Sequence, residues 1–86
     1  MRVLLAEDEE SLSEALAMIL RRNGYEVETV GDGLTAMEYM DRGSYDAAIL
    51  DIMMPKADGI TVLKAIRGKG DLTPVLMCRA ADCGRR

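Results

Sequence analysis

Three carboxylates follow short apolar runs in the sequence. Glu7 and Asp8 come directly after residues 3–6, and Asp51 closes the apolar run that begins after Asp46. If both runs are neighbouring parallel strands, their carboxyl ends meet at one edge of a sheet, where ligands usually bind. Carboxylates held together repel unless a cation joins them, and oxygen ligands with room for water suit Mg²⁺. Since a carboxylate can be phosphorylated, the candidate chemistry is metal binding with phosphoryl transfer to Asp51.

Each acid taken singly also has a plainer interpretation. Acids often end strands and begin helices, where they accept hydrogen bonds from unpaired N–H groups and complement the helix dipole. Two features together favour a functional site. A buried run precedes the acid in both places, and the loop at residues 53–59 is too long and too broken to be a simple turn.

The surrounding sequence predicts alternating strands and helices. Apolar runs at residues 3–6, 46–51 and 73–78 are typical of buried strands, and the alternation at 25–30 indicates a half-exposed edge strand. Ser11 with Glu14 resembles a capping box for a first helix that ends at Asn23 and Gly24. Further helices are expected from residue 34 to near 43 and from 60 to 67. The order predicts an α/β fold with a parallel sheet.

Composition narrows the classes of protein. The chain has 86 residues, enough for one small domain, and its net charge of −4 argues against a nucleic-acid-binding face. No apolar run approaches the roughly 20 residues needed to span a bilayer, and no signal peptide is evident. Cys78 and Cys83 without any His indicate reduced thiols rather than a zinc site. We expect a cytoplasmic protein without membrane contact.

The motifs as a set resemble a known family. Val-Leu-Leu-Ala-Glu-Asp-Glu at residues 3–9, Ile-Leu-Asp-Ile-Met-Met-Pro at 49–55 and the pair Asp58-Gly59 closely resemble the receiver domain of two-component response regulators. The resemblance covers residues 2–77. It implies a flavodoxin-like, three-layer αβα fold with parallel strands in the order 2-1-3-4. The opening stretch most resembles receivers that precede winged-helix DNA-binding domains, and we expect no DNA binding by this chain itself.

The resemblance also implies roles for individual residues. Asp51 would be the phosphoacceptor, phosphorylated by a sensor histidine kinase. Mg²⁺ would be bound by Asp8, by Asp51 and by the backbone carbonyl of Met53, with Glu7 acting through water. The loop after the phosphoacceptor would be shaped by Pro55, Asp58 and Gly59, of which Asp58 resembles a helix cap more than a ligand.

The chain departs from the family pattern after residue 78. Arg79 stands where the family has a Ser or Thr that binds the phosphoryl group, and the family's Lys after a fifth strand is absent. The fourth and fifth helices and the fifth strand are also missing. We therefore expect a C-terminally truncated receiver at residues 1–78, an irregular tail at 79–86 and an impaired switch. Arg79 is either a solvated tail residue or a guanidinium that pairs with Asp51 or a phosphate.

Truncation would leave the strand at residues 75–78 as a bare edge beside an uncovered sheet face. Such edges pair with other chains, so we expect a homodimer through this edge and face. Two functions remain open: a phosphoacceptor in signal transduction, and a dimerising scaffold derived from a receiver that is not phosphorylated. A phosphatase is disfavoured because Met53 occupies the position of the second Asp that such enzymes need. We expect a phosphoacceptor rather than an enzyme.

Overall fold

The computed structural model describes residues 1–78. Four strands and three helices alternate along this part of the chain, as the sequence predicts. They are β1 (Arg2–Ala6), α1 (Glu10–Arg22), β2 (Glu26–Val30), α2 (Gly33–Arg42), β3 (Ala47–Asp51), α3 (Gly59–Gly68) and β4 (Val75–Cys78). The expectations for Arg79, Cys83 and the tail at 79–86 lie outside the described residues.

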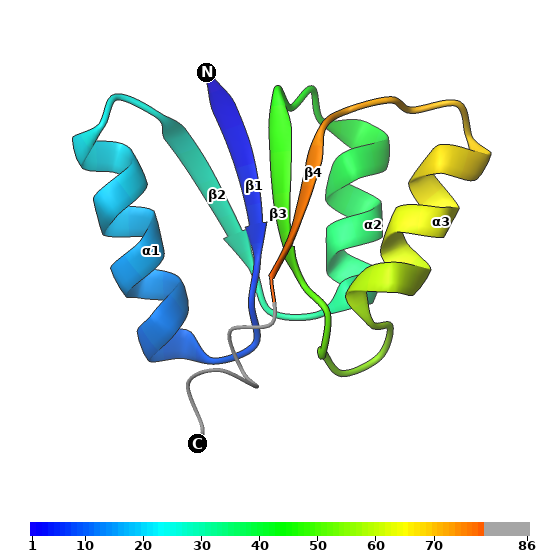
Figure 1. Ribbon diagram of the computed structural model, residues 1–86, viewed down its shortest axis with the longest axis horizontal. Coiled ribbons are helices and arrows are strands. Elements are labelled where there is room, and N and C mark those ends of the chain that lie inside the picture. The colour runs from blue at the N-terminus through cyan, green and yellow to red at the C-terminus, as the bar shows by residue number, and fades with distance from the viewer. Residues whose placement is uncertain (79–86) are drawn as a thin grey trace.

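All four strands are parallel and lie in the order β2-β1-β3-β4. The register places Ala6 of β1 beside Val30 of β2 and Leu50 of β3, and Asp51 beside Cys78 of β4. Helix α1 lies on one side of the sheet and α2 and α3 lie on the other (Figure 1). The three-layer, flavodoxin-like fold and its strand order are therefore confirmed.

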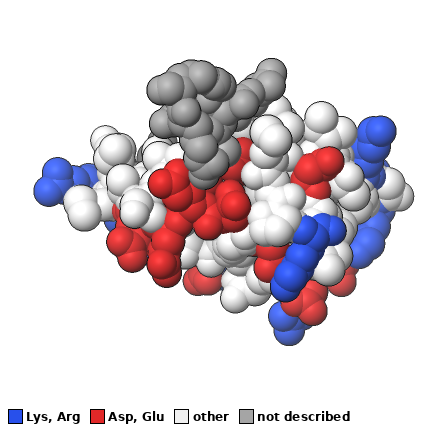
Figure 2. Space-filling model, turned by 90° about the horizontal axis from the view of Figure 1, so that it is seen from below, with Lys and Arg blue, Asp and Glu red and all other residues white. Residues whose placement is uncertain are grey.

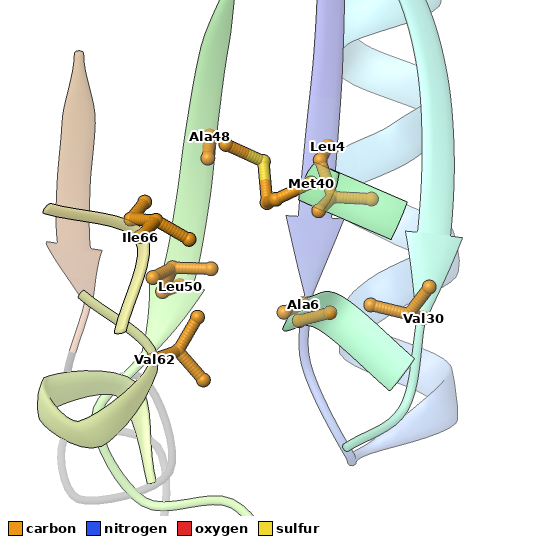
Figure 3. Close-up of a cluster of buried hydrophobic side chains, with 9 residues drawn as sticks. Leu4, Ala6, Val30, Met40, Ala48, Leu50, Val62 and Ile66 are labelled. Atoms are coloured by element: carbon orange, nitrogen blue, oxygen red, sulfur yellow. The ribbon is translucent and has the colours of Figure 1, made fainter. Parts of the chain in front are cut away.

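The larger core lies between the sheet and the pair α2 and α3. Met40 of α2 projects between Leu4 of β1 and Ala48 of β3, while Leu50 lies close to Val62 of α3 (Figure 3). These side chains are aliphatic or thioether groups, so their burial leaves no side-chain N–H or oxygen without a hydrogen-bond partner. Their burial provides the main hydrophobic stabilisation of the fold and holds β1 and β3 side by side.

A smaller core lies on the opposite face, beneath α1. Ala17 of α1 packs with Leu5 of β1 and Val27 of β2, and Leu16 and Ile49 pack against the margin of this cluster. Because α1 contacts the two strands on one side of the sheet, β3 and β4 have no helix over them on this face within residues 1–78.

Helices α2 and α3 begin at capping aspartates. Asp32 accepts a hydrogen bond from the Thr35 N–H, and Asp58 accepts one from the Thr61 N–H, each at 2.8 Å. The capping box expected at Ser11 is wrong, because α1 begins at Glu10 and its N-cap is Glu9, two residues before Ser11. The Glu9 carbonyl accepts the first helical hydrogen bond, from the Ser13 N–H at 2.9 Å.

No helix within residues 1–78 is long and apolar enough to cross a membrane. Cys78, at the end of β4, is a half-buried free thiol. The other end of the sheet is tied down by Arg2, whose backbone N–H donates to the Asp46 carboxylate at 2.7 Å. This bond holds the start of β1 beside the start of β3, and the carboxyl ends of the strands all point toward the same side of the molecule (Figure 1).

Candidate functional site

The three acids predicted from the sequence meet at the carboxyl end of the sheet. Glu7 and Asp8 follow β1, and Asp51 is the last residue of β3. One carboxylate oxygen from each of the three lies within 4.8 Å of the others. Acidic side chains also gather at the centre of this end of the molecule, with basic ones toward its edges (Figure 2). Asp51 follows Asp8 by 43 positions in the sequence, and the direct pairing of β1 with β3 brings the two residues together.

The carboxylate of Asp51 is buried and only partly satisfied. The residue is 1% exposed, and its Oδ1 accepts a hydrogen bond from the Met53 N–H at 3.1 Å. Its Oδ2 has no hydrogen-bond partner among the described residues. Because an unsatisfied buried carboxylate oxygen is costly, this atom has bonding capacity that a ligand can use.

Glu7 is buried beside Asp51 and is held by backbone hydrogen bonds. Its own N–H donates to the Val30 carbonyl at 3.0 Å, and its Oε2 accepts from the Glu9 N–H at 2.9 Å. Burial raises the pKa of Glu7 to about 6, and the nearby charge of Asp51 adds to this rise. The Glu9 N–H acts in the opposite direction. Glu7 therefore resists carrying a negative charge unless a cation compensates it.

This set of donors fits a hard divalent cation. Three carboxylates within reach of one another, one of them with an orphaned oxygen, match the oxygen ligands that Mg²⁺ prefers. Asp8 is exposed, so the site opens to solvent on its side. The roles expected for the Met53 carbonyl and for water at Glu7 remain predictions.

The loop after Asp51 is fixed at several points. Next to Asp51, the Ile52 N–H donates to the Cys78 carbonyl at 2.8 Å, and the Ile52 carbonyl accepts from the Gly59 N–H at 2.9 Å. At the tip, the Ala57 N–H donates to the Pro55 carbonyl at 2.8 Å. Both ends of the loop are therefore tied to β4 and α3, which limits the movement of the segment that carries Asp51.

A second contact to this loop was not predicted from the sequence. The Gly33 N–H, at the start of α2, donates to the Pro55 carbonyl at 3.4 Å, and a Cβ on residue 33 would overlap the Ala57 carbonyl. Lys56, which has a positive φ of 70°, pairs with Asp32 at 3.8 Å. The sequence Gly31-Asp32-Gly33 indicated only a turn. A glycine directly after a helix-capping acid was the one signal that a close approach could be required.

Comparison with protein families gives one match over nearly the whole chain. Residues 3–83 match the model of the response regulator receiver domain. The transcriptional regulatory protein DltR of Streptococcus agalactiae is 44% identical over 80 residues, which are 93% of this chain and 36% of DltR. The response regulator MprA of Mycobacterium leprae is 42% identical over 82 residues, which are 95% of this chain and 36% of MprA.

Solved structures show the same architecture. The receiver domain of the Francisella response regulator 1452 superposes with a TM-score of 0.87 at 32% identity, covering 88% of this chain and 63% of that one. The chemotaxis response regulator CheY4 of Vibrio cholerae gives 0.85 at 35% identity, covering 88% and 65%. The chain spans about a third of the length of the curated relatives that it matches.

Proposed function

Because the chain belongs to the response regulator receiver family, we propose that it is a phosphoacceptor module of two-component signal transduction in which Asp51 is phosphorylated by a sensor histidine kinase. The observation that carries this proposal is the state of the Asp51 carboxylate. It is buried, one oxygen is held by the Met53 N–H, and the other has no partner among the described residues. A buried acid whose only role was structural would have both oxygens satisfied.

The proposed reaction transfers one phosphoryl group. A carboxylate oxygen of Asp51 attacks the phosphorus of a phosphohistidine, a P–O bond forms, the P–N bond breaks, and the imidazole leaves with the electron pair. The backbone contacts of Ile52 and Gly59 hold Asp51 at the end of β3, so the nucleophile is positioned before the donor arrives. The incoming group carries negative charge into a site that already holds three carboxylates, and within residues 1–78 neither ion pair involves any of them.

A bound Mg²⁺ would supply the missing positive charge for the phosphoryl oxygens. We propose that Asp8 and Asp51 bind it directly, that the backbone carbonyl of Met53 adds a further oxygen and that Glu7 contributes through water. Glu7 must lose its proton to take part, and its pKa of about 6 allows this near neutral pH. In this proposal the chain accepts phosphate and is not itself an enzyme.

We place this activity in the cytoplasm, with the kinase as the partner. DltR is named a transcriptional regulatory protein, yet this chain covers 36% of its length. We propose that the chain corresponds to the phosphate-receiving part of such a regulator. A net charge of −4 and an acidic carboxyl end of the sheet do not favour DNA contact by these residues.

Beryllofluoride, which mimics a phosphoryl group on a carboxylate, tests the site. In the presence of Mg²⁺, fluorine NMR should show a bound signal for the unmodified chain and none for Asp51→Asn. Asp41→Asn is a matched control, because Asp41 is exposed on α2 and pairs with Lys69 away from the site. A bound signal that persists in Asp51→Asn would reject the proposed role of Asp51.

One observation favours the second candidate, a dimerising scaffold that is not phosphorylated. Leu76 of β4 is 64% exposed on the sheet face that α1 leaves uncovered, and β4 is one of the two edge strands of the described sheet. A dimer through this edge and face, with no beryllofluoride binding and no phosphoryl acceptance, would support the scaffold. Binding that depends on Asp51 would support the phosphoacceptor whatever the oligomeric state.

A further inference from the structure

A small polar pocket lies at the amino end of the sheet, at the opposite end of the molecule from Asp51 (Figure 1). Its volume is about 260 Å³, below the roughly 300 to 1,000 Å³ of pockets for drug-sized ligands, so it suits a small molecule. Its walls come from β1, β2, the last turn of α2 and the loop before β3. The residues that line it are two arginines, one glutamate, two tyrosines and one glycine, namely Arg2, Arg42, Glu28, Tyr39, Tyr45 and Gly43.

The guanidinium of Arg2 is held in place by groups that leave its charge unpaired. It donates to the Ser44 carbonyl at 3.1 Å, and its central carbon lies 4.7 Å from the centroid of the Tyr45 ring. The carboxylate of Asp46 accepts from the backbone N–H of Arg2 rather than from its side chain. Neither ion pair within residues 1–78 involves an arginine. Because a guanidinium carries several N–H donors in a planar fork, Arg2 can still bind an oxyanion.

Arg42 supplies a second guanidinium from the end of α2. It is exposed, and its side chain makes no hydrogen bond or ion pair with any other of residues 1–78. The wall beside it depends on Gly43, whose N–H donates to the Tyr39 carbonyl at 2.7 Å. A Cβ on residue 43 would come within 2.6 Å of the Tyr45 ring. The absence of a side chain there therefore allows Tyr45 to pack against the end of α2.

Glu28 gives the pocket one negative charge. Val27 lies in the core beneath α1, so Glu28, the next residue of β2, faces the side of the sheet that α2 covers. Burial raises the pKa of Tyr45, and the charge of Glu28 adds to this rise while Arg2 opposes it. The Tyr45 hydroxyl therefore keeps its proton and can donate a hydrogen bond. The pocket thus combines two positive charges, one negative charge and a phenol donor.

We propose that this pocket binds a free acidic α-amino acid such as glutamate. The guanidiniums of Arg2 and Arg42 bind its two carboxylates, Glu28 binds its ammonium group, and the tyrosine rings pack against its methylene groups. Two anionic groups and one cationic group are the complement of the charges that line the pocket. A phosphate or a simple dicarboxylate lacks the cationic group and is repelled by Glu28. This inference goes beyond phosphoacceptance and does not depend on it.

A series of three ligands tests the predicted class. Binding is followed from the amide signals of the ¹⁵N-labelled 86-residue chain, at constant pH and ionic strength and without divalent cations. Glutamate carries all three charged groups, glutarate lacks the ammonium group, and α-aminobutyrate lacks the second carboxylate. We expect glutamate to bind with a dissociation constant of about 1 mM or lower and to shift the signals of residues 42–45. Glutarate and α-aminobutyrate should each bind at least about fivefold more weakly, since one charged contact is lost.

Two pairs of variants assign the contacts. Arg42→Gln should weaken glutamate binding at least about fivefold, whereas Arg22→Gln, which removes an exposed arginine at the end of α1, should leave it unchanged. Glu28→Gln should weaken glutamate binding about threefold and strengthen glutarate binding, so that the two ligands bind about equally. Glu26→Gln, on the same strand but outside the pocket, should preserve the preference for glutamate. All four residues are exposed, and dispersed amide signals check that each variant is folded.

Three results would overturn the proposal. The first is no change in the amide signals with glutamate at about 20 mM. The second is glutarate binding as tightly as glutamate to the unmodified chain, which indicates a general anion site. The third is equal weakening in Arg22→Gln and Arg42→Gln, which indicates unspecific attraction to basic side chains.

Discussion

Gly59 lies against the backbone of Asp51. A Cβ on residue 59 would come within 2.5 Å of the Asp51 carbonyl oxygen, and the Gly59 N–H donates to the next carbonyl, that of Ile52, at 2.9 Å. The first residue of α3 is therefore packed directly on the end of β3. The position of the candidate phosphoacceptor depends on the absence of a side chain eight residues further along the chain.

Gly59→Ala should therefore destabilise the protein by about 2 kcal/mol, because the new methyl group can be accommodated only if backbone moves. Gly68→Ala at the end of α3 is the matched control. A Cβ there meets nothing within 4 Å, so the change should be neutral or stabilise by up to about 1 kcal/mol. Urea unfolding of both variants measures the difference. Equal stability of the two would contradict the close packing of Gly59 on Asp51.

Glu7 should make stability depend on pH in the absence of divalent cations. Its pKa is about 6 in the folded chain and near 4.5 when unfolded, so between these values the folded chain holds an additional proton. By linkage, the free energy of unfolding should rise as pH falls through 6 and level off below 4.5. Hydrogen bonds lower the pKa values of three other carboxyl groups, those of Asp32, Asp58 and Asp71. These groups reduce the free energy of unfolding as the pH falls, but only below a pH of about 3.8.

Urea unfolding between pH 7 and 4.5 tests this dependence. Glu7→Gln should remove most of the rise, because the amide does not titrate in this range. Glu14→Gln, on the exposed side of α1, should retain it. A rise of the same size in Glu7→Gln would assign the titration to another group.

Mg²⁺ should stabilise the folded chain through the three acids. At ten times its dissociation constant, a ligand that binds only the folded state adds about 1.4 kcal/mol to the free energy of unfolding. Asp51→Asn should raise stability without metal, since it removes one of three repelling charges, and should reduce the gain from Mg²⁺. Thermal unfolding with and without Mg²⁺ measures both effects, with Asp41→Asn as a control. A gain from Mg²⁺ that is unchanged in Asp51→Asn would place the ion elsewhere.

Much of this arrangement could be predicted from local patterns in the sequence. Uninterrupted apolar runs are typical of strands buried on both faces, and the acid after each run marked the carboxyl end of β1 and β3. The start of α1 could not be predicted in the same way. Ser11 has the residue type of a cap, but the hydrogen bond from the Ser13 N–H to the Glu9 carbonyl extends the helix past it.

Contacts between distant segments were harder to predict. The approach of Gly33 to Ala57 joins the start of α2 to the loop after Asp51, and nothing in either segment alone requires it. The exposure of Ile19 was also hidden, because its spacing fits the buried side of an amphipathic helix. The structure shows that this side chain is 56% exposed, because α1 packs mainly on β1 and β2.

The central claim is that Asp51 accepts a phosphoryl group, and intact mass after incubation with acetyl phosphate and Mg²⁺ tests it most directly. We expect a mass increase of about 80 Da, the mass of one phosphoryl group, for the unmodified chain and for Asp41→Asn. The increase should be absent from Asp51→Asn and should be lost on treatment with hydroxylamine, which cleaves acyl phosphates. No increase in the unmodified chain, or an equal increase in Asp51→Asn, would contradict the account.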